Sequence, residues 1–358
     1  MAKNLVLCCD GTWDSADQAA DPKTGEICVS NVLKMAVRMK KVTAAGKLQI
    51  VYYDQGVGTG NVLDKIGGGA FGDGLEANIN DVYRFLLANY EPGDAIYLFG
   101  FSRGAYTARS IAGMIRRCGI LKRENVRHYP DAKALYRSGV HAGDPKAVQF
   151  RKDFAIEDST ALQCVGVWDT VGALGIPLHG FGDFNEKKFA FLDTSLSTAV
   201  KFAFHALSID ERRGPFKPTL WDSEPVAGQT VQQAWFAGVH SDIGGGYPEH
   251  GLSDLALNWM MDCAATAGAE PDPAVVNALG TKPDPAQAIH NSLKGLFKVD
   301  TFDRVIGATK FKTEYFHRSV IEKFRDDKNY RPKPLQAHTA RLQALAGAAL
   351  NDAMYPVA

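Results

Sequence analysis

Short runs of apolar residues, each closed by a polar or reactive side chain, recur along the first two thirds of the chain. Clear examples are residues 5–9, 48–53, 95–99, 162–168 and 232–239. Runs of this length that are mostly apolar are typical of parallel strands that are covered on both faces. Two segments with apolar residues at helical spacing, 31–41 and 75–90, separate the first three runs. This alternation predicts an α/β fold with a mostly parallel sheet and helices on both faces.

The third run leads into the most informative stretch of the sequence. It is followed at once by Gly100-Phe101-Ser102-Arg103-Gly104 and then by a helical pattern that reaches Gly119. A Gly-x-Ser-x-Gly turn between a strand and a helix forces its serine into a strained backbone conformation and lifts the hydroxyl above the sheet edge. This nucleophile elbow predicts an α/β-hydrolase-like fold with Ser102 as nucleophile. The alternative interpretation is an ordinary turn in which Ser102 caps the helix.

Five apolar runs end in side chains that carry chemistry, and the carboxyl ends of parallel strands lie along one sheet edge. These side chains are Asp10, Asp54, Ser102, Asp169 and His240. Serine hydrolysis needs a base beside the hydroxyl and a carboxylate that orients the base. The chain order nucleophile, acid, histidine of the α/β-hydrolases is met by Ser102, Asp169 and His240. We therefore predict that these three residues form a catalytic triad.

Each of these assignments has an alternative. Asp169 is also placed to cap a turn, and His240 is also compatible with a structural histidine. His317 is the rival base, because the histidine of this fold often comes late in the chain, but it follows a mixed run rather than a clean strand.

An oxyanion hole needs two preorganised N–H donors. We expect one from the backbone of Arg103, directly after the nucleophile, and the other from Gly11 or Thr12, after the first strand. The Arg103 side chain could bind an anion or pair with a structural carboxylate, and the structural role is favoured.

The 358 residues are predicted to form a single domain with additions. Cap-like insertions are expected at 120–158 and 177–200, and a helical extension at 270–358. Phe181 and Phe184 lie in the second insertion and are candidates for substrate binding. Their alternative interpretation is ordinary core and loop.

Composition narrows the function further. Forty Lys and Arg balance forty Asp and Glu, so no overall field attracts nucleic acid or an anionic membrane, and any lipid contact must be local and apolar. Six cysteines without a CxxC pair indicate reduced core thiols. No signal peptide or apolar span of about 20 residues is evident, which makes the cytoplasm the default location and leaves signal-independent secretion open.

The sequence offers candidates for two further kinds of site. Asp10, Asp14 and Asp242 are carboxylates that could bind a hard cation, but the sequence does not show that they meet, and Asp10 is expected to fix its own loop. The glycine-rich stretches 56–60 and 67–74 could cradle a phosphate in a nucleotide-binding protein. Neither matches a P-loop or a dinucleotide fingerprint. The sequence therefore predicts no metal and no cofactor.

Four motifs occur in the order typical of a known family. They are Cys9-Asp10-Gly11-Thr12-Trp13, Gly100-Phe101-Ser102-Arg103-Gly104-Ala105-Tyr106, Val167-Trp168-Asp169-Thr170-Val171 and Gly238-Val239-His240-Ser241-Asp242-Ile243-Gly244-Gly245-Gly246. Over roughly residues 4 to 250 the chain thus resembles the DUF2235 family, which includes the Tle1-type phospholipase effectors of bacterial type VI secretion.

The resemblance implies an α/β-hydrolase fold, cleavage of acyl esters and a triad on Ser102, Asp169 and His240. It favours a serine hydrolase that acts through an acyl-enzyme, of phospholipase A type. The alternative is an esterase or thioesterase for a soluble acyl compound, since effector-type relatives are larger and carry a membrane-engaging region that has no counterpart here. A small-molecule or lipid ester is the expected partner. Peripheral membrane contact and a secretion-machinery or immunity partner stay open.

Overall fold

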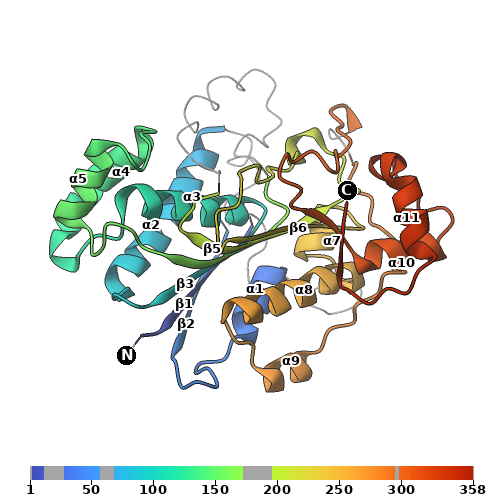
Figure 1. The fold of residues 1–358 in the computed structure, drawn as a ribbon, viewed down its shortest axis with the longest axis horizontal. Helices are drawn as coiled ribbons and strands as arrows, with labels where there is room; N and C mark the ends of the chain where they lie inside the picture. Colours follow the sequence, from blue (N-terminus) through green and yellow to red (C-terminus); the bar gives the residue numbers. More distant parts are fainter. Residues whose placement is uncertain (1, 12–27, 57–67, 172–195, 295–297, 358) are drawn as a thin grey trace.

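The structure, a computed structural model, describes residues 2–11, 28–56, 68–171, 196–294 and 298–357. Within them, strands form an eight-stranded sheet of order β2-β1-β3-β4-β5-β6-β7-β8 (Figure 1). Strands β1 to β7 run parallel, and β8 pairs antiparallel with β7. The strands are β1 (Asn4–Cys9), β2 (Gln49–Asp54), β3 (Ala95–Phe101), β4 (Leu162–Trp168), β5 (Val200–Ser208), β6 (Thr230–Phe236), β7 (Glu314–His317) and β8 (Met354–Pro356).

Helices cover both faces of the sheet (Figure 1). One face carries α1 (Asn31–Arg38), α8 (Gly251–Ala267) and α9 (Pro273–Leu279), and the other carries α2 (Gly68–Asn89), α3 (Arg103–Cys118), α4 (Tyr129–Arg137) and α5 (Pro145–Phe154). Alternate side chains of β1 serve the two layers: Leu5 and Leu7 pack with the α2 and α3 side, whereas Val6 and Cys8 pack with α1 and α8. Burial on both faces explains why the strands have no polar alternation.

The remaining elements are short or lie at the far end of the sheet. Helices α10 (Arg318–Asp326) and α11 (Thr339–Ala346) pack with β7 and β8 in a third apolar cluster. The short helix α7 (His240–Gly244) follows β6, and 3₁₀ helices form at η1 (Arg123–His128), η2 (Gly214–Phe216) and η4 (Lys333–His338). No helix in the described ranges has the length and apolar character that crossing a bilayer requires.

The region after residue 270 differs from the expected helical extension. It also supplies β7 and β8, which lengthen the sheet past β6. These strands have four and three residues, too few for a period of two to stand out in the sequence. The last helix of this region, α11, ends at Ala346, and the chain returns as β8. The insertion expected at 120–158 is helical in the structure, and most of the one at 177–200 lies outside the described residues.

Two glycines allow α3 to start directly against the sheet. A Cβ on Gly104 would lie 2.0 Å from the carbonyl oxygen of Cys9, at the end of β1. A Cβ on Gly100 would lie 2.3 Å from the carbonyl oxygen of Gly104. Both distances are far below van der Waals contact, so any larger residue would push the helix away from the strands. The residue between them, Ser102, is therefore held in a tight turn.

Candidate active site

Ser102 lies in that turn with a backbone conformation that side chains rarely adopt. Its φ of 57° and ψ of −118° place a non-glycine residue outside the favoured regions. Its amide donates to the carbonyl oxygen of Trp168, 3.1 Å away at the end of β4. Ser102 occupies the N-cap position of α3, but its side chain makes no capping hydrogen bond. The helix-capping interpretation therefore does not account for this serine.

The strand order puts Ser102 beside a topological switch point. After β1 the chain moves outward to β2 and then returns to form β3 on the other side of β1. In doubly wound sheets, ligands bind in the crevice outside the carboxyl ends of the strands at such a point. Asp10 and Ser102 follow the two strands that flank it. Asp54 is the last residue of β2, and Asp169 and His240 follow β4 and β6 along the same edge, as the apolar runs predict.

Asp169 and His240 are joined directly, although 71 positions separate them. Nδ1 of His240 lies 2.6 Å from Oδ2 of Asp169, and both side chains are almost completely buried. The His240 ring packs on the ring of Phe101, the residue before Ser102, with centroids 4.6 Å apart. The edge contact with Phe216, at 4.8 Å, fixes the ring from another side. A histidine whose Nδ1 donates to a carboxylate keeps Nε2 for proton transfer.

Arg304 completes the surroundings of Asp169 and was not identified from the sequence. Its two terminal nitrogens lie 2.9 and 3.0 Å from the two carboxylate oxygens. The amide of Ser208 donates to Oδ1 of the same carboxylate at 3.0 Å. Arg304 is one of several charged residues in a polar stretch without periodicity, so no sequence signal distinguishes it from a surface arginine.

The protonation of the pair follows from burial and charge. Burial by itself would raise the pKa of Asp169, but the Arg304 guanidinium and the hydrogen bond from His240 outweigh it and hold that pKa below its usual range. Burial lowers the pKa of His240, and Asp169 and Glu211 oppose this only in part. The expected state at neutral pH is therefore an ionised Asp169 beside a neutral imidazole, which is able to accept a proton.

The rival base, His317, is in a different environment. Its Nδ1 lies 2.8 Å from the hydroxyl of Ser319, and it accepts the Ser319 amide as the N-cap of α10. Its ring stacks on Phe236, with centroids 4.4 Å apart. Burial and then the charge of Arg318 lower the pKa of His317 to about 3. His317 thus bonds to a hydroxyl where His240 bonds to a carboxylate.

The candidate oxyanion donors are only partly described. Arg103 is the first residue of α3, so its amide lies at the helix N-terminus, where an anion is favoured. The Gly11 amide instead donates to the carboxylate of Asp10 at 2.7 Å, which leaves it engaged within its own loop. Thr12 lies outside the described residues, as do the aromatic candidates Phe181 and Phe184.

Asp10 and Asp242, two of the three candidate cation ligands, each have hydrogen-bond partners within the protein. Asp10 accepts hydrogen bonds from the hydroxyls of Ser30 and Tyr53 at 2.5 and 2.6 Å. Asp242 accepts from the amide of Val239 and lies 2.6 Å from Nδ1 of His290. Among the residues the structure describes, no group of three or more His, Cys, Asp or Glu side chains is placed to hold a metal ion. Asp14 lies outside them.

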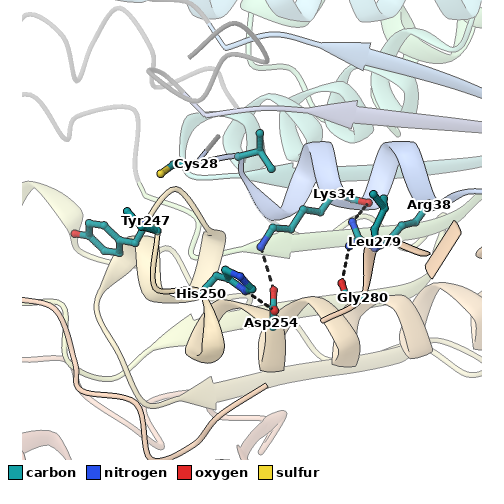
Figure 2. A pocket seen from close by; sticks show the side chains of 10 residues that line it. Cys28, Lys34, Arg38, Tyr247, His250, Asp254, Leu279 and Gly280 are labelled. Carbon is teal, nitrogen blue, oxygen red and sulfur yellow. Dashed lines mark hydrogen bonds and ion pairs between the residues drawn. The ribbon is translucent and has the colours of Figure 1, made fainter. Parts of the chain in front are cut away.

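A cavity of about 270 Å³ lies between α1 and the start of α8 (Figure 2). Asp254 lines it, 3.0 Å from Nζ of Lys34 and 2.6 Å from Nδ1 of His250. Arg38 donates to the carbonyl oxygens of Lys34 and Gly280. These bonds link α1 with α8 and with the end of α9, and Lys34 and His250 pair with the Asp254 carboxylate within the cavity. We interpret it as a structural junction.

Fold and site together define an α/β protein with a buried histidine–carboxylate pair next to a strained serine at the carboxyl edge of its sheet. Residues 3–263 match the family described as the type VI secretion system phospholipase effector Tle1-like catalytic domain. Because this match covers well over half of the chain, the protein belongs to that family. The motif resemblance and the α/β fold expected from the sequence are thereby confirmed.

Individual relatives are more distant. The uncharacterized protein YEL023C of Saccharomyces cerevisiae is 30% identical over 249 residues, which are 62% of this chain and 33% of the yeast protein. A crystal structure of an uncharacterized protein from Pseudomonas aeruginosa has a TM-score of 0.51 at 16% identity and covers 98% of this chain and 55% of that one. The Tle1 effector bound to the VgrG spike has a TM-score of 0.43 at 20% identity over 69% of this chain and 51% of that one. The chain thus spans a third to about half of these relatives.

The buried carboxylate of Asp54, at the end of β2, should make the stability of the folded protein depend on pH. It is buried, its Oδ2 has no hydrogen-bond partner within the described residues, and burial, followed by the charges of Asp81 and Asp10, raises its pKa to about 7. An unfolded aspartate has a pKa of about 3.9, so between these values the folded state holds a proton that the unfolded state has released. Stability should therefore fall as pH rises through this window.

We expect Asp54→Asn to remove much of this dependence. Between pH 5 and pH 8 the free energy of unfolding, measured by urea denaturation, should fall by about 2 kcal/mol more in the wild type than in the variant. Asp153→Asn, at an exposed carboxylate on α5, is the matched control and should behave like the wild type. Parallel curves for wild type and Asp54→Asn would show that Asp54 is not protonated in the folded state.

Proposed function

We propose that the protein is a serine hydrolase that cleaves carboxylic esters through an acyl-enzyme, with phospholipase A-type activity. The observation that carries the proposal is the buried His240–Asp169 pair packed on Phe101, next to the strained Ser102. A nucleophile, a neutral base and an ionised carboxylate that orients the base are the groups acyl transfer needs.

In the proposed mechanism the Ser102 hydroxyl attacks the ester carbonyl while Nε2 of His240 takes its proton. The resulting imidazolium returns the proton to the leaving alcohol, and water then repeats the sequence to release the acid. Asp169 stays ionised and stabilises the imidazolium. The amide of Arg103, at the start of α3, donates to the oxyanion.

Membership of the Tle1-like family favours phospholipid over a soluble ester as substrate. Exposed apolar side chains near the site support a lipid surface. Val299 and Val305 are 81% and 60% exposed. The segment between them is bonded to the chain before Phe216, because the amide of Phe302 donates to the carbonyl oxygen of Arg212. Phe216 in turn contacts His240. A partner in type VI secretion machinery, suggested by the family name, stays a prediction.

The first prediction concerns the nucleophile. Purified wild type should react with a fluorophosphonate at Ser102, and with a mixed phospholipid panel it should release fatty acid and lysophospholipid. Ser102→Ala should do neither while keeping the wild-type melting temperature. Mass spectrometry of protein and lipids identifies the adduct and the cleaved position. Turnover of short nitrophenyl esters alone would keep the triad and move the substrate to soluble acyl compounds; activity in Ser102→Ala would disprove the nucleophile.

The second prediction separates the two histidines. His240→Ala and Asp169→Asn should each lower kcat on a short nitrophenyl ester on the order of 10³-fold or more, because the base or its orienting carboxylate is lost. His317→Ala should change kcat by less than about threefold at a temperature where it stays folded. The reverse pattern, with His317→Ala inactive and His240→Ala active, would identify His317 as the base.

The third prediction concerns contact with lipid. Replacing Val299 and Val305 together by Asp should lower the rate on anionic phospholipid vesicles about tenfold or more, because two apolar contacts are exchanged for two repelled charges. The rate on a short soluble ester should stay within about twofold. Val126→Asp, at a 55% exposed valine on η1, is the matched control. Equal losses on both substrates would argue against a lipid-contacting surface here.

A further inference from the structure

We propose that Arg304 is a positioning residue that acts through Asp169: it holds this carboxylate ionised and oriented, and so lowers the pH at which the Asp169–His240 pair takes up a proton. The inference deepens the proposed function and rests on it for its catalytic meaning. The effect of the buried Arg304 on the protonation of the Asp169–His240 pair can be tested without any substrate.

Arg304 and Asp169 form a bidentate ion pair. The guanidinium of Arg304 meets the carboxylate of Asp169 with one terminal nitrogen on each oxygen, and both side chains are fully buried. Such a fork matches the planar geometry of a carboxylate and fixes its rotation as well as its distance. With the Ser208 amide on Oδ1 and His240 on Oδ2, the carboxylate receives four hydrogen bonds. Asp169 can therefore present Oδ2 to the imidazole in only one orientation.

Arg304 also supports the imidazole along a second route. The nitrogen that bonds Oδ2 of Asp169 lies 2.8 Å from the carbonyl oxygen of Phe216 as well. The Phe216 ring contacts the His240 ring edge to face. One guanidinium group thus connects the carboxylate on one side of His240 with the aromatic ring on another, and its removal would loosen both.

The charge of Arg304 decides the direction of its effect. An isolated carboxylate beside His240 would strongly favour the imidazolium, whereas a carboxylate already paired with a guanidinium attracts that second cation less. Because the pair is coupled, the quantity that moves is the pH at which Asp169 and His240 together take up a proton. With Arg304 present this uptake occurs at lower pH, so the neutral base persists into more acidic conditions.

Other charged groups around His240 do not replace Arg304. Glu211 accepts the His240 amide at 3.2 Å and favours the imidazolium. Arg213 opposes it but is bonded to Glu211 through two nitrogens. His205, near Asp169, accepts the Thr170 amide with Nε2, and burial and then the charge of Arg109 lower its pKa to about 3, so it is neutral. Arg304 is bonded to Asp169 itself.

The decisive measurement is an NMR titration of the pair in the whole protein. Protein labelled with ¹³C-histidine gives nine ring signals, and the spectrum of His240→Gln assigns the one of interest. In Arg304→Met the proton uptake seen at His240 should move to higher pH by about one unit or more, because a neighbouring opposite charge typically shifts a carboxylate by one to three units. In Arg304→Lys, which keeps the charge, the midpoint should stay near that of the wild type.

A reactivity profile connects this shift with the proposed chemistry. The rate of fluorophosphonate labelling of Ser102 should decrease as the pH is lowered and His240 takes up a proton, and in Arg304→Met this decrease should begin at a higher pH than in the wild type. Below the pH of this decrease, labelling of Arg304→Met should be about tenfold slower than that of the wild type. Above it, the two rates should agree within about threefold. A merely structural role would lower the rate equally at all pH values. If the wild type is not labelled, the proposed function fails, but the NMR titration still decides the role of Arg304.

An unstable Arg304→Met protein would not leave the question open. The double variant Asp169→Asn/Arg304→Met carries neither charge, so its melting temperature should exceed that of Arg304→Met, in which the buried carboxylate is left without its partner. Equal melting temperatures, or an unchanged His240 midpoint in a folded Arg304→Met, would overturn the inference. If the midpoint pH of proton uptake at His240 rises as much in Arg304→Lys as in Arg304→Met, the charge of Arg304 is not the cause of the effect.

Discussion

The contact of backbone with backbone between the start of α3 and the end of β1 is the constraint on which the site depends. Glycine at 100 and 104 lets the helix begin where any Cβ would meet a carbonyl oxygen at 2.0 to 2.3 Å. The single residue that must reverse direction between them is Ser102, and its positive φ is the consequence. The strain is maintained because β3 and α3 are both packed in the core and neither can relax.

A second close approach fixes the other half of the site. A Cβ on Gly244, in α7, would lie 2.0 Å from the ring of Phe101. The same ring carries the imidazole of His240 on its surface. Because Phe101 belongs to β3 and directly precedes Ser102, one strand sets both the position of the serine and the plane of the histidine ring. Shortage of space, more than any single hydrogen bond, aligns these groups.

The sequence predicted the elements that are buried on both faces but not those that depend on distant partners. Strands β1, β3 and β4 are mostly apolar, and the reactive residues after them follow from strand direction alone. Strands β7 and β8 are too short to carry a pattern, and Arg304 resembles any surface arginine until the fold buries it. The engagement of the Gly11 amide by Asp10 is likewise a local geometric detail that residue types do not encode.

Two kinds of buried carboxylate share one edge of the sheet, and their difference follows from where their partners lie in the chain. Asp54, the last residue of β2, has no cation beside it among the described residues, and its pKa is raised to about 7. Asp169, after β4, has a guanidinium from residue 304, beyond the residues 3–263 that match the family, and its pKa is depressed. A buried carboxylate that must stay ionised needs a compensating charge. The last part of this chain, which also extends the sheet with β7 and β8, therefore contributes to the electrostatics of the site as well as to the core.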